Sequence, residues 1–282
     1  MSRVRTLVAT EILLVLGLLG FLGLVHAIEV VWVGDITITG FPALLIPLVP
    51  AILWLSYFHN QDRHEPRPKL FVFGVFLIGA FVAGPAAEIL IQLVTRERAI
   101  PSLRSISAEQ LLAAVLTVGL AQELCKYLVV RYTIYQSSEF DEPLDGILYM
   151  TAAGIGFATH QNIRYVWSSQ EVLVTAASGH AVVTTLGHAC FASVLGFALG
   201  RAKFFCNRPR ERSLTLLGGL LVAATLNGHF AVITETMRQS GVEVHRWRSV
   251  TFAAVFAAVI FFITSLFMRR LLARPSPSES ES

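Results

Sequence analysis

Apolar runs of about 20 residues recur along this chain between short polar loops, and this repetition constrains the fold more than any other feature. A helix rises about 1.5 Å per residue, so a run of roughly 20 residues crosses the hydrocarbon core of a bilayer. A composition of 54% hydrophobic and 15% charged residues also excludes a water-soluble domain. The sequence therefore predicts an all-α, polytopic transmembrane bundle of about eight spans, at residues 7–28, 40–58, 70–95, 110–134, 144–167, 175–200, 214–236 and 249–270.

These spans predict one membrane domain over residues 1–273, followed by a tail at 274–282. The tail is rich in Pro, Ser and Glu, a composition typical of a disordered segment. The residues Val25 to Ala27 resemble a signal-peptidase site, but the first apolar run is longer than most signal cores, so we expect an uncleaved anchor. The three cysteines lie in or beside apolar runs, and no disulfide is expected.

The basic residues predict the orientation in the membrane. If the N-terminus lies inside, 14 of the 22 Lys and Arg residues fall in inner segments or at the inner ends of spans, six fall in outer loops, and the remaining two are Lys126 and Arg164. This excess predicts that both ends face the cytoplasm. Because the net charge of +3 resides in these short loops, it indicates topology and predicts no nucleic-acid partner.

Polar side chains within the spans are the candidates for function, because an ionisable group in hydrocarbon costs several kcal/mol. The candidates are Glu88, Glu123, Lys126, His160, Arg164, His180, His188 and His229, with the amides Asn162 and Asn227. Counting about 1.5 Å per residue puts Glu123 and His188 at similar depth, with His229 about one turn nearer the outside. One carboxylate, two imidazoles and a water form a reasonable catalytic zinc site.

Structural roles explain the same residues without any metal. A buried His or Asn often forms a hydrogen bond with a neighbouring helix. Glu123 and Lys126, three residues apart, can neutralise each other, and Glu88 can serve as an ion-pair partner. The spacing alone therefore leaves an enzyme and a transporter open.

Several motifs occur in a characteristic order, and together they resemble the PrsW family of intramembrane metalloproteases. They are Asp62–Pro68 (DRHEPRP), Gln122–Lys126 (QELCK), Asp145–Tyr149 (DGILY), Gly156–Asn162 (GFATHQN), His188–Phe191 (HACF) and Gly196–Gly200 (GFALG). They are similar to the family patterns DRxEPEP, EExxK, DGxxY, GFAxxEN, HAxF and GYxLG over about residues 55–235. The resemblance implies kinship with the CAAX prenyl endopeptidases. It also implies a bacterial plasma-membrane protease that cuts a membrane-anchored protein, such as an anti-sigma factor, near the outer face.

The sequence departs from these patterns at chemically important positions. Gln122 replaces the first Glu of EExxK, and Gln161 replaces the Glu of the GFAxxEN motif. An amide cannot act as a general base or contribute ligand charge. His180 stands where the family usually has Arg.

A last motif, similar to LHxxxN, reads Leu226–Phe230 (LNGHF) and allows two registers. Either Asn227 or His229 occupies the position of the family His, and the two lie about 200° apart around a helix. We prefer His229, because Asn is a poor zinc ligand.

Three functions follow. The leading hypothesis is a zinc-dependent intramembrane protease in which Glu123, His188 and His229 hold the metal while Lys126, Gln122 or Asn162 orients the site. A pseudoprotease that binds or scaffolds membrane proteins is the alternative favoured by the two Glu-to-Gln changes. A transporter ranks last, because the sequence shows no inverted repeats.

Overall fold

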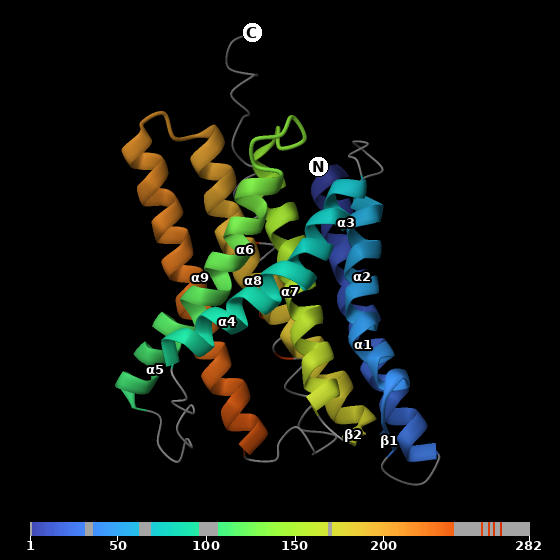
Figure 1. Ribbon diagram of the computed structural model, residues 1–282. Coiled ribbons are helices and arrows are strands. Elements are labelled where there is room, and N and C mark those ends of the chain that lie inside the picture. The colour runs from blue at the N-terminus through green and yellow to red at the C-terminus, as the bar shows by residue number, and fades with distance from the viewer. Residues whose placement is uncertain are drawn as a thin grey trace.

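The computed structural model describes residues 2–31, 36–61, 69–95, 107–168 and 171–239, together with the single positions 255, 259, 262 and 266. The described chain is a bundle of helices (Figure 1). Its helices are α1 (Ser2–Val31), α2 (Leu45–Gln61), α3 (Lys69–Ile78), α4 (Gly84–Thr95), α5 (Ala108–Ala114), α6 (Leu120–Thr133), α7 (Pro143–Ser168), α8 (Val174–Phe204) and α9 (Pro209–Gln239).

The prediction of an all-α, polytopic membrane protein is confirmed. Five helical segments among the described residues are long and apolar enough to cross a membrane, namely Ile12–Val31, Leu70–Thr95, Ala108–Thr133, Val174–Phe204 and Pro209–Met237. The apolar segment Phe41–Tyr57 is shorter, and α7 is long but more polar. The predicted count of about eight spans is therefore not confirmed. The predicted span 249–270, apart from four single positions, and the predicted tail lie outside the described residues.

Two of the long segments contain a π-helical turn. The turn η2 (Gly79–Ala83) joins α3 to α4, and η3 (Val115–Gly119) joins α5 to α6. In Figure 1, α4 and α5 consequently run obliquely across the bundle. A π turn adds a residue to the helical repeat and re-aims the side chains that follow, which is why such turns often occur beside functional sites. Gln122 and Glu123 follow η3 directly in the first turn of α6.

The centre of the bundle is the packing of α7 against α8. Small residues allow their backbones to touch, since a Cβ atom on Gly196 would lie 2.7 Å from the carbonyl carbon of Gly146. Close approach through small residues is the usual way in which helices associate in lipid, where the hydrophobic effect between helices is absent. In the apolar stretch of α8, 94% of the residues are buried inside the bundle. The side chains of α8 are therefore almost all enclosed by the other helices.

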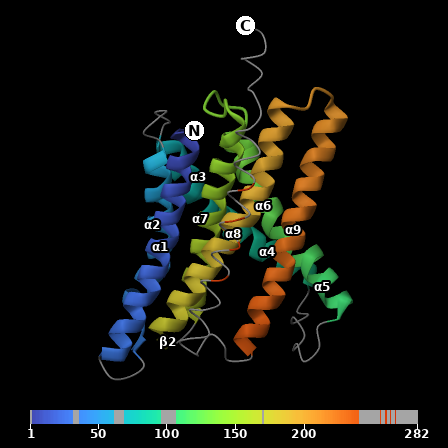
Figure 2. The same ribbon diagram turned by 180° about the vertical axis from the view of Figure 1, so that it is seen from behind.

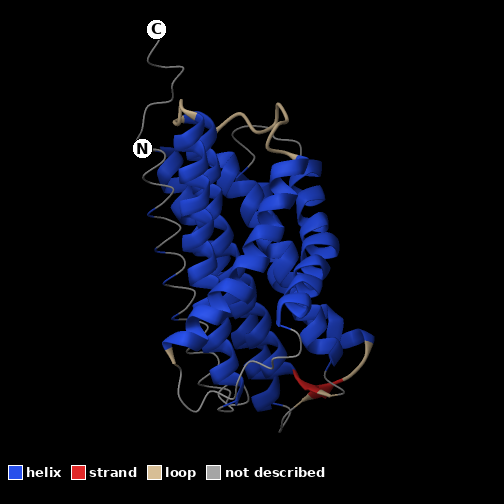
Figure 3. Cartoon of the chain, turned by 60° about the vertical axis from the view of Figure 1, so that its left-hand side comes forward, coloured by secondary structure: helices blue, strands red, loops and turns tan. Residues whose placement is uncertain are grey.

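At one end of the bundle a short pairing ties α8 to the first helix. The strands β1 (Thr37–Ile38) and β2 (Val172–Leu173) pair antiparallel (Figure 3). Beside them, the buried carboxylate of Glu29 accepts a hydrogen bond from the backbone nitrogen of Thr175 at 3.3 Å. This carboxylate lies at the N-terminus of α8, where a negative charge is favourable. Helix α1 is therefore packed into the bundle and lies beside α2 at one edge (Figures 1 and 2).

Candidate functional site

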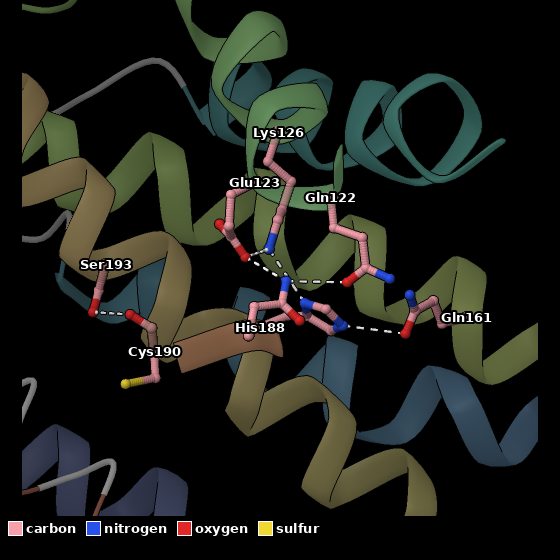
Figure 4. A network of polar contacts seen from close by, with 8 residues as sticks. Gln122, Glu123, Lys126, Gln161, His188, Cys190 and Ser193 are labelled. Carbon is pink, nitrogen blue, oxygen red and sulfur yellow. Dashed lines mark hydrogen bonds and ion pairs between the residues drawn. The ribbon is translucent and has the colours of Figure 1, made fainter. Parts of the chain in front are cut away.

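A cluster of polar side chains lies in the interior of the bundle, where four helices meet (Figure 4). Its members, called here the polar cluster, are Gln122, Glu123 and Lys126 from α6, Gln161 from α7, His188 from α8 and Asn227 from α9. Gln161 is half-buried and the other five are buried, with Glu123 and Lys126 at 0% exposure. The described chain thus gathers these groups far from water, where each needs a partner.

The ammonium group of Lys126 is the centre of the polar cluster. Its Nζ lies 2.5 Å from Glu123 Oε1 and 3.2 Å from His188 Nδ1. The i, i+3 spacing on α6 puts the two charged side chains on one face of the helix. The ring of Phe157, with its centroid 5.2 Å from Nζ, covers the ammonium on another side. Lys126 therefore bridges a carboxylate and an imidazole from two different helices.

These contacts fix the tautomer of His188. An ammonium group only donates, so Nδ1 of His188 accepts from Lys126. The proton of the neutral ring then resides on Nε2, which lies 3.1 Å from Gln161 Oε1 and donates to it. Figure 4 shows the imidazole between Lys126 on one side and Gln161 on the other. Both ring nitrogens of His188 are consequently engaged.

Asn227 completes the polar cluster from α9. Its Nδ2 donates to Glu123 Oε1 at 2.7 Å and to Gln122 Oε1 at 3.0 Å. The Glu123 oxygen therefore receives bonds from both an amide and an ammonium. Every bond in the polar cluster has one donor and one acceptor of the correct type.

The prediction that His229 faces this site is wrong. His229 is exposed, and its Nδ1 lies 2.7 Å from the carbonyl oxygen of Thr225 on its own helix. Two residues advance a helix by about 200°, so Asn227 and His229 cannot face the same centre. Asn227 occupies the place expected for His229, and Glu123, His188 and His229 do not come together.

A pattern in the sequence of α9 distinguishes the two registers. Ala223, Ala224, Asn227 and Gly228 share the buried face, whereas Leu221, Val222, Leu226, His229 and Ile233 share the exposed face. Small residues are typical of helix–helix contacts in membranes, and large aliphatic residues of lipid contacts. The preference of zinc for imidazole over an amide favoured His229 as the residue that faces the site. The small size of the residues around Asn227 favours Asn227 instead.

Asn162, expected to orient the site, lies outside the polar cluster. Its Nδ2 donates to the carbonyl oxygen of Ala181 at 3.3 Å and to Thr185 Oγ1 at 3.2 Å, both on α8. It therefore links α7 to α8. His180 is also elsewhere, with its ring stacked on that of Tyr165 at a centroid distance of 3.9 Å.

A second group of charges joins α4 to α7. Glu88 Oε1 contacts His160 Nε2 at 3.0 Å and forms an ion pair with Arg164. The ring of His160 fits against α4 because residue 84 is a glycine, where a Cβ atom would lie 2.5 Å from its Cγ. Glu88 is thus an ion-pair partner, the structural role expected for it.

The polar cluster does not fit a catalytic zinc ion. Such a site uses three His, Cys, Asp or Glu ligands and leaves one position for water. The described residues contain no group of three such side chains placed to hold a metal. In the polar cluster only Glu123 and His188 are of these types, and the other neighbours are the amides Gln122, Gln161 and Asn227.

Comparison with known proteins places this chain in a family. The model of the PrsW family intramembrane metalloprotease matches residues 67–274. Protease PrsW of Geobacillus kaustophilus is 36% identical over 163 residues, which are 58% of this chain and 68% of that protein. Protease PrsW of Bacillus subtilis is 30% identical over 190 residues, 66% of this chain and 79% of that protein.

Protease PrsW of Clostridioides difficile is 26% identical over 192 residues, 67% of this chain and 77% of that protein. No solved structure matches the chain significantly. The family match includes four of the five helices that are long and apolar enough to span a membrane, and all six residues of the polar cluster. The chain therefore belongs to the PrsW family, which is described as a family of intramembrane metalloproteases.

Proposed function

We propose that this chain hydrolyses peptide bonds of membrane-anchored protein substrates, and that the polar cluster is where the peptide bond is bound. Membership of the PrsW family makes the chain an intramembrane protease. The observation that supports the site is the burial of a charge pair, an imidazole and three amides at the meeting point of four helices. Ionisable groups in such positions are usually retained for function.

The chemistry available to the polar cluster follows from its atoms. Glu123 is the group placed to take a proton from an attacking water, because its Oε2 has no hydrogen-bond partner among the described residues, whereas both ring nitrogens of His188 are engaged. Lys126 contacts both residues at 2.5 and 3.2 Å, and its positive charge stabilises negative charge that develops on a scissile carbonyl. The amide of Asn162 maintains the spacing of α7 and α8 through Ala181 and Thr185.

The finer features of the proposal rest on the family resemblance. We propose a single-span protein such as an anti-sigma factor as the substrate, with cleavage near the outer face of a bacterial plasma membrane. The family description implies a metal, and zinc is the metal that the sequence favoured. The donors present do not fit zinc, so no step of the proposed hydrolysis passes through it.

A pseudoprotease is the second candidate, and one observation favours it. Three of the six side chains in the polar cluster are amides, at positions 122, 161 and 227. Amides bind peptide groups through hydrogen bonds but do not remove a proton from water. Such a cluster is suited to binding a substrate segment without cutting it.

Reconstituted protein distinguishes the two candidates. The full-length chain is placed in vesicles with a tagged single-span protein, and cleavage is followed by gel. We expect His188→Ala and Glu123→Gln each to lower the rate by about 10²-fold or more, as loss of an acid–base group does. His229→Ala is the matched control, because it removes an exposed imidazole, and it keeps the wild-type rate. Binding of the substrate without cleavage by the wild type supports the pseudoprotease.

A further inference from the structure

We infer that the ammonium group of Lys126 takes the place of a metal cation in the polar cluster, so that the site is charge-balanced without zinc. The inference deepens the proposed function, and only its consequence for hydrolysis rests on that proposal. Three observations carry it: the position of the ammonium, the direction of the hydrogen bonds and the total charge.

The first observation is the position of the ammonium. A zinc ion bound by Glu123 and His188 would lie about 2 Å from an oxygen of one and a nitrogen of the other. Lys126 Nζ lies between these same groups, 2.5 Å from Oε1 of Glu123 and 3.2 Å from Nδ1 of His188. The side chains of all three are at most 1% exposed. A positive charge already occupies the space on which the carboxylate and the imidazole converge.

The second observation is the direction of the hydrogen bonds, which engage Oε1 of Glu123, while its Oε2 is buried with no hydrogen-bond partner among the described residues. Lys126 donates to Glu123 and to His188, His188 donates to Gln161, and Asn227 donates to Gln122 and Glu123. No member must change its protonation to satisfy a neighbour. The Nε2 nitrogen of His188 carries a proton in this arrangement, whereas a metal ligand needs a free lone pair.

The third observation is charge. Glu123 and Lys126 cancel, and the imidazole and amides are neutral, so the polar cluster carries no net charge. A zinc ion added beside Lys126 would leave an excess of two positive charges in a buried site, which is strongly unfavourable. Carboxylates at positions 122 and 161 would change this. They would give the cluster two negative charges, which match a divalent cation. The two glutamines therefore suit an internal ammonium.

Zinc content of the purified full-length chain tests the inference. The wild type is equilibrated with excess zinc, desalted and measured by elemental analysis. We expect less than about one zinc per ten chains, since a catalytic site needs three protein donors. One zinc per chain in the wild type would overturn the inference.

A variant designed to bind zinc tests whether the charge and the donors of the polar cluster are what exclude the metal. The variant combines three substitutions: Gln122→Glu, Gln161→Glu and Asn227→His. Together they add two negative charges and an imidazole around His188 and Glu123. We expect about one zinc per chain, because the charge and the donors then suit a divalent cation. Adding His229→Ala to this variant leaves the zinc content unchanged, because His229 faces away. A folded triple variant without zinc, or zinc that depends on His229, contradicts the charge argument.

Cleavage in the presence of a chelator separates the inference from the proposed function. If the wild type cuts a single-span substrate, EDTA changes the rate by less than about twofold, because no zinc is removed. A rate that EDTA abolishes and added zinc restores would overturn the inference. If the wild type cuts nothing, the proposed hydrolysis fails, while the zinc content still decides the inference.

Discussion

At the scale of single residues, the stability of the polar cluster depends on a buried charge pair. Glu123 and Lys126 are both completely buried, and each is the other's charged partner at 2.5 Å. A buried pair of this kind is not strongly stabilising in itself, because two charges lose their hydration. Removing one partner is costly, since the other charge is left buried without compensation.

Lys126→Met is therefore expected to be more damaging than the removal of both charges. The single change leaves Glu123 uncompensated and lowers the free energy of unfolding by about 3–5 kcal/mol, whereas Glu123→Gln/Lys126→Met costs clearly less. Unfolding in detergent micelles, analysed as a double-mutant cycle with Glu123→Gln, measures the coupling. Additive losses from the two single changes would mean that the ion pair does not stabilise the fold.

Asn227 and His229 provide a second test at this scale. Asn227→Ala removes two buried hydrogen bonds, to Gln122 and to Glu123, and we expect a loss of about 1–3 kcal/mol. His229→Ala removes an exposed ring bonded to its own helix, and we expect a change within about 0.5 kcal/mol. Thermal unfolding of the two variants in parallel gives the ranking. The opposite ranking would place His229 in the interior.

The sequence predicted much of the polar cluster. Gln122, Glu123, Lys126 and His188 were expected at one site, and the structure brings them together. The choice between Asn227 and His229 failed because it was made from zinc chemistry rather than from the faces of α9. Asn162 was misplaced for a different reason: it adjoins Gln161 in sequence, but the next residue on a helix points about 100° away.

At the scale of elements, the apolar runs predicted the helices to within a few residues. The predicted spans 110–134 and 144–167 correspond to Ala108–Thr133 and to α7. The π turns were not predicted, because they depend on packing between helices rather than on local hydrophobicity. At η3, for example, Gly119 lies against the backbone of α9, where a Cβ atom would lie 3.0 Å from the nitrogen of Gly228.

The contact of α7 with α3 gives a prediction at this scale. A Cβ atom on Gly156 would overlap the carbonyl oxygen of Phe76 and lie 3.0 Å from the nitrogen of Ala80. Gly156→Ala must therefore separate two backbones, and we expect a loss of about 1–3 kcal/mol in unfolding experiments.

Gly74 on α3 is the matched control, because nothing lies within 4 Å of a Cβ atom built there. Gly74→Ala should leave stability unchanged or raise it by up to about 1 kcal/mol, the difference in helix propensity. If both alanines were tolerated equally, close packing of α7 on α3 would be excluded.

At the scale of the whole molecule, the basic α8–α9 connection distinguishes one end of the bundle from the other. The α6–α7 and α8–α9 connections lie at the same end as the N-terminus, and the β1–β2 pairing lies at the other end (Figures 1 and 2). The α8–α9 connection is flanked by the basic residues Arg201, Lys203, Arg208, Arg210 and Arg212. At this end, Lys203 Nζ also donates to the carbonyl oxygens of Tyr135 and Phe140, at 2.7 and 2.6 Å. Because short basic connections favour the cytoplasmic side of a membrane, we expect this end of the bundle to face the cytoplasm.

Cysteine labelling in intact cells tests this orientation. Asn207 and Glu171 are both exposed and lie in connections at opposite ends of the bundle, so they form a matched pair. Each is changed to Cys after Cys125, Cys190 and Cys206 have been replaced by Ser or Ala. We expect a membrane-impermeant maleimide to label Glu171→Cys in intact cells and Asn207→Cys only after the cells are opened, because the basic connection lies inside. Labelling of Asn207→Cys alone from outside would invert the whole bundle. In that inverted bundle, the end that holds β1, β2 and the carboxylate of Glu29 would face the cytoplasm, and the basic residues around Asn207 would have crossed the membrane against their charge.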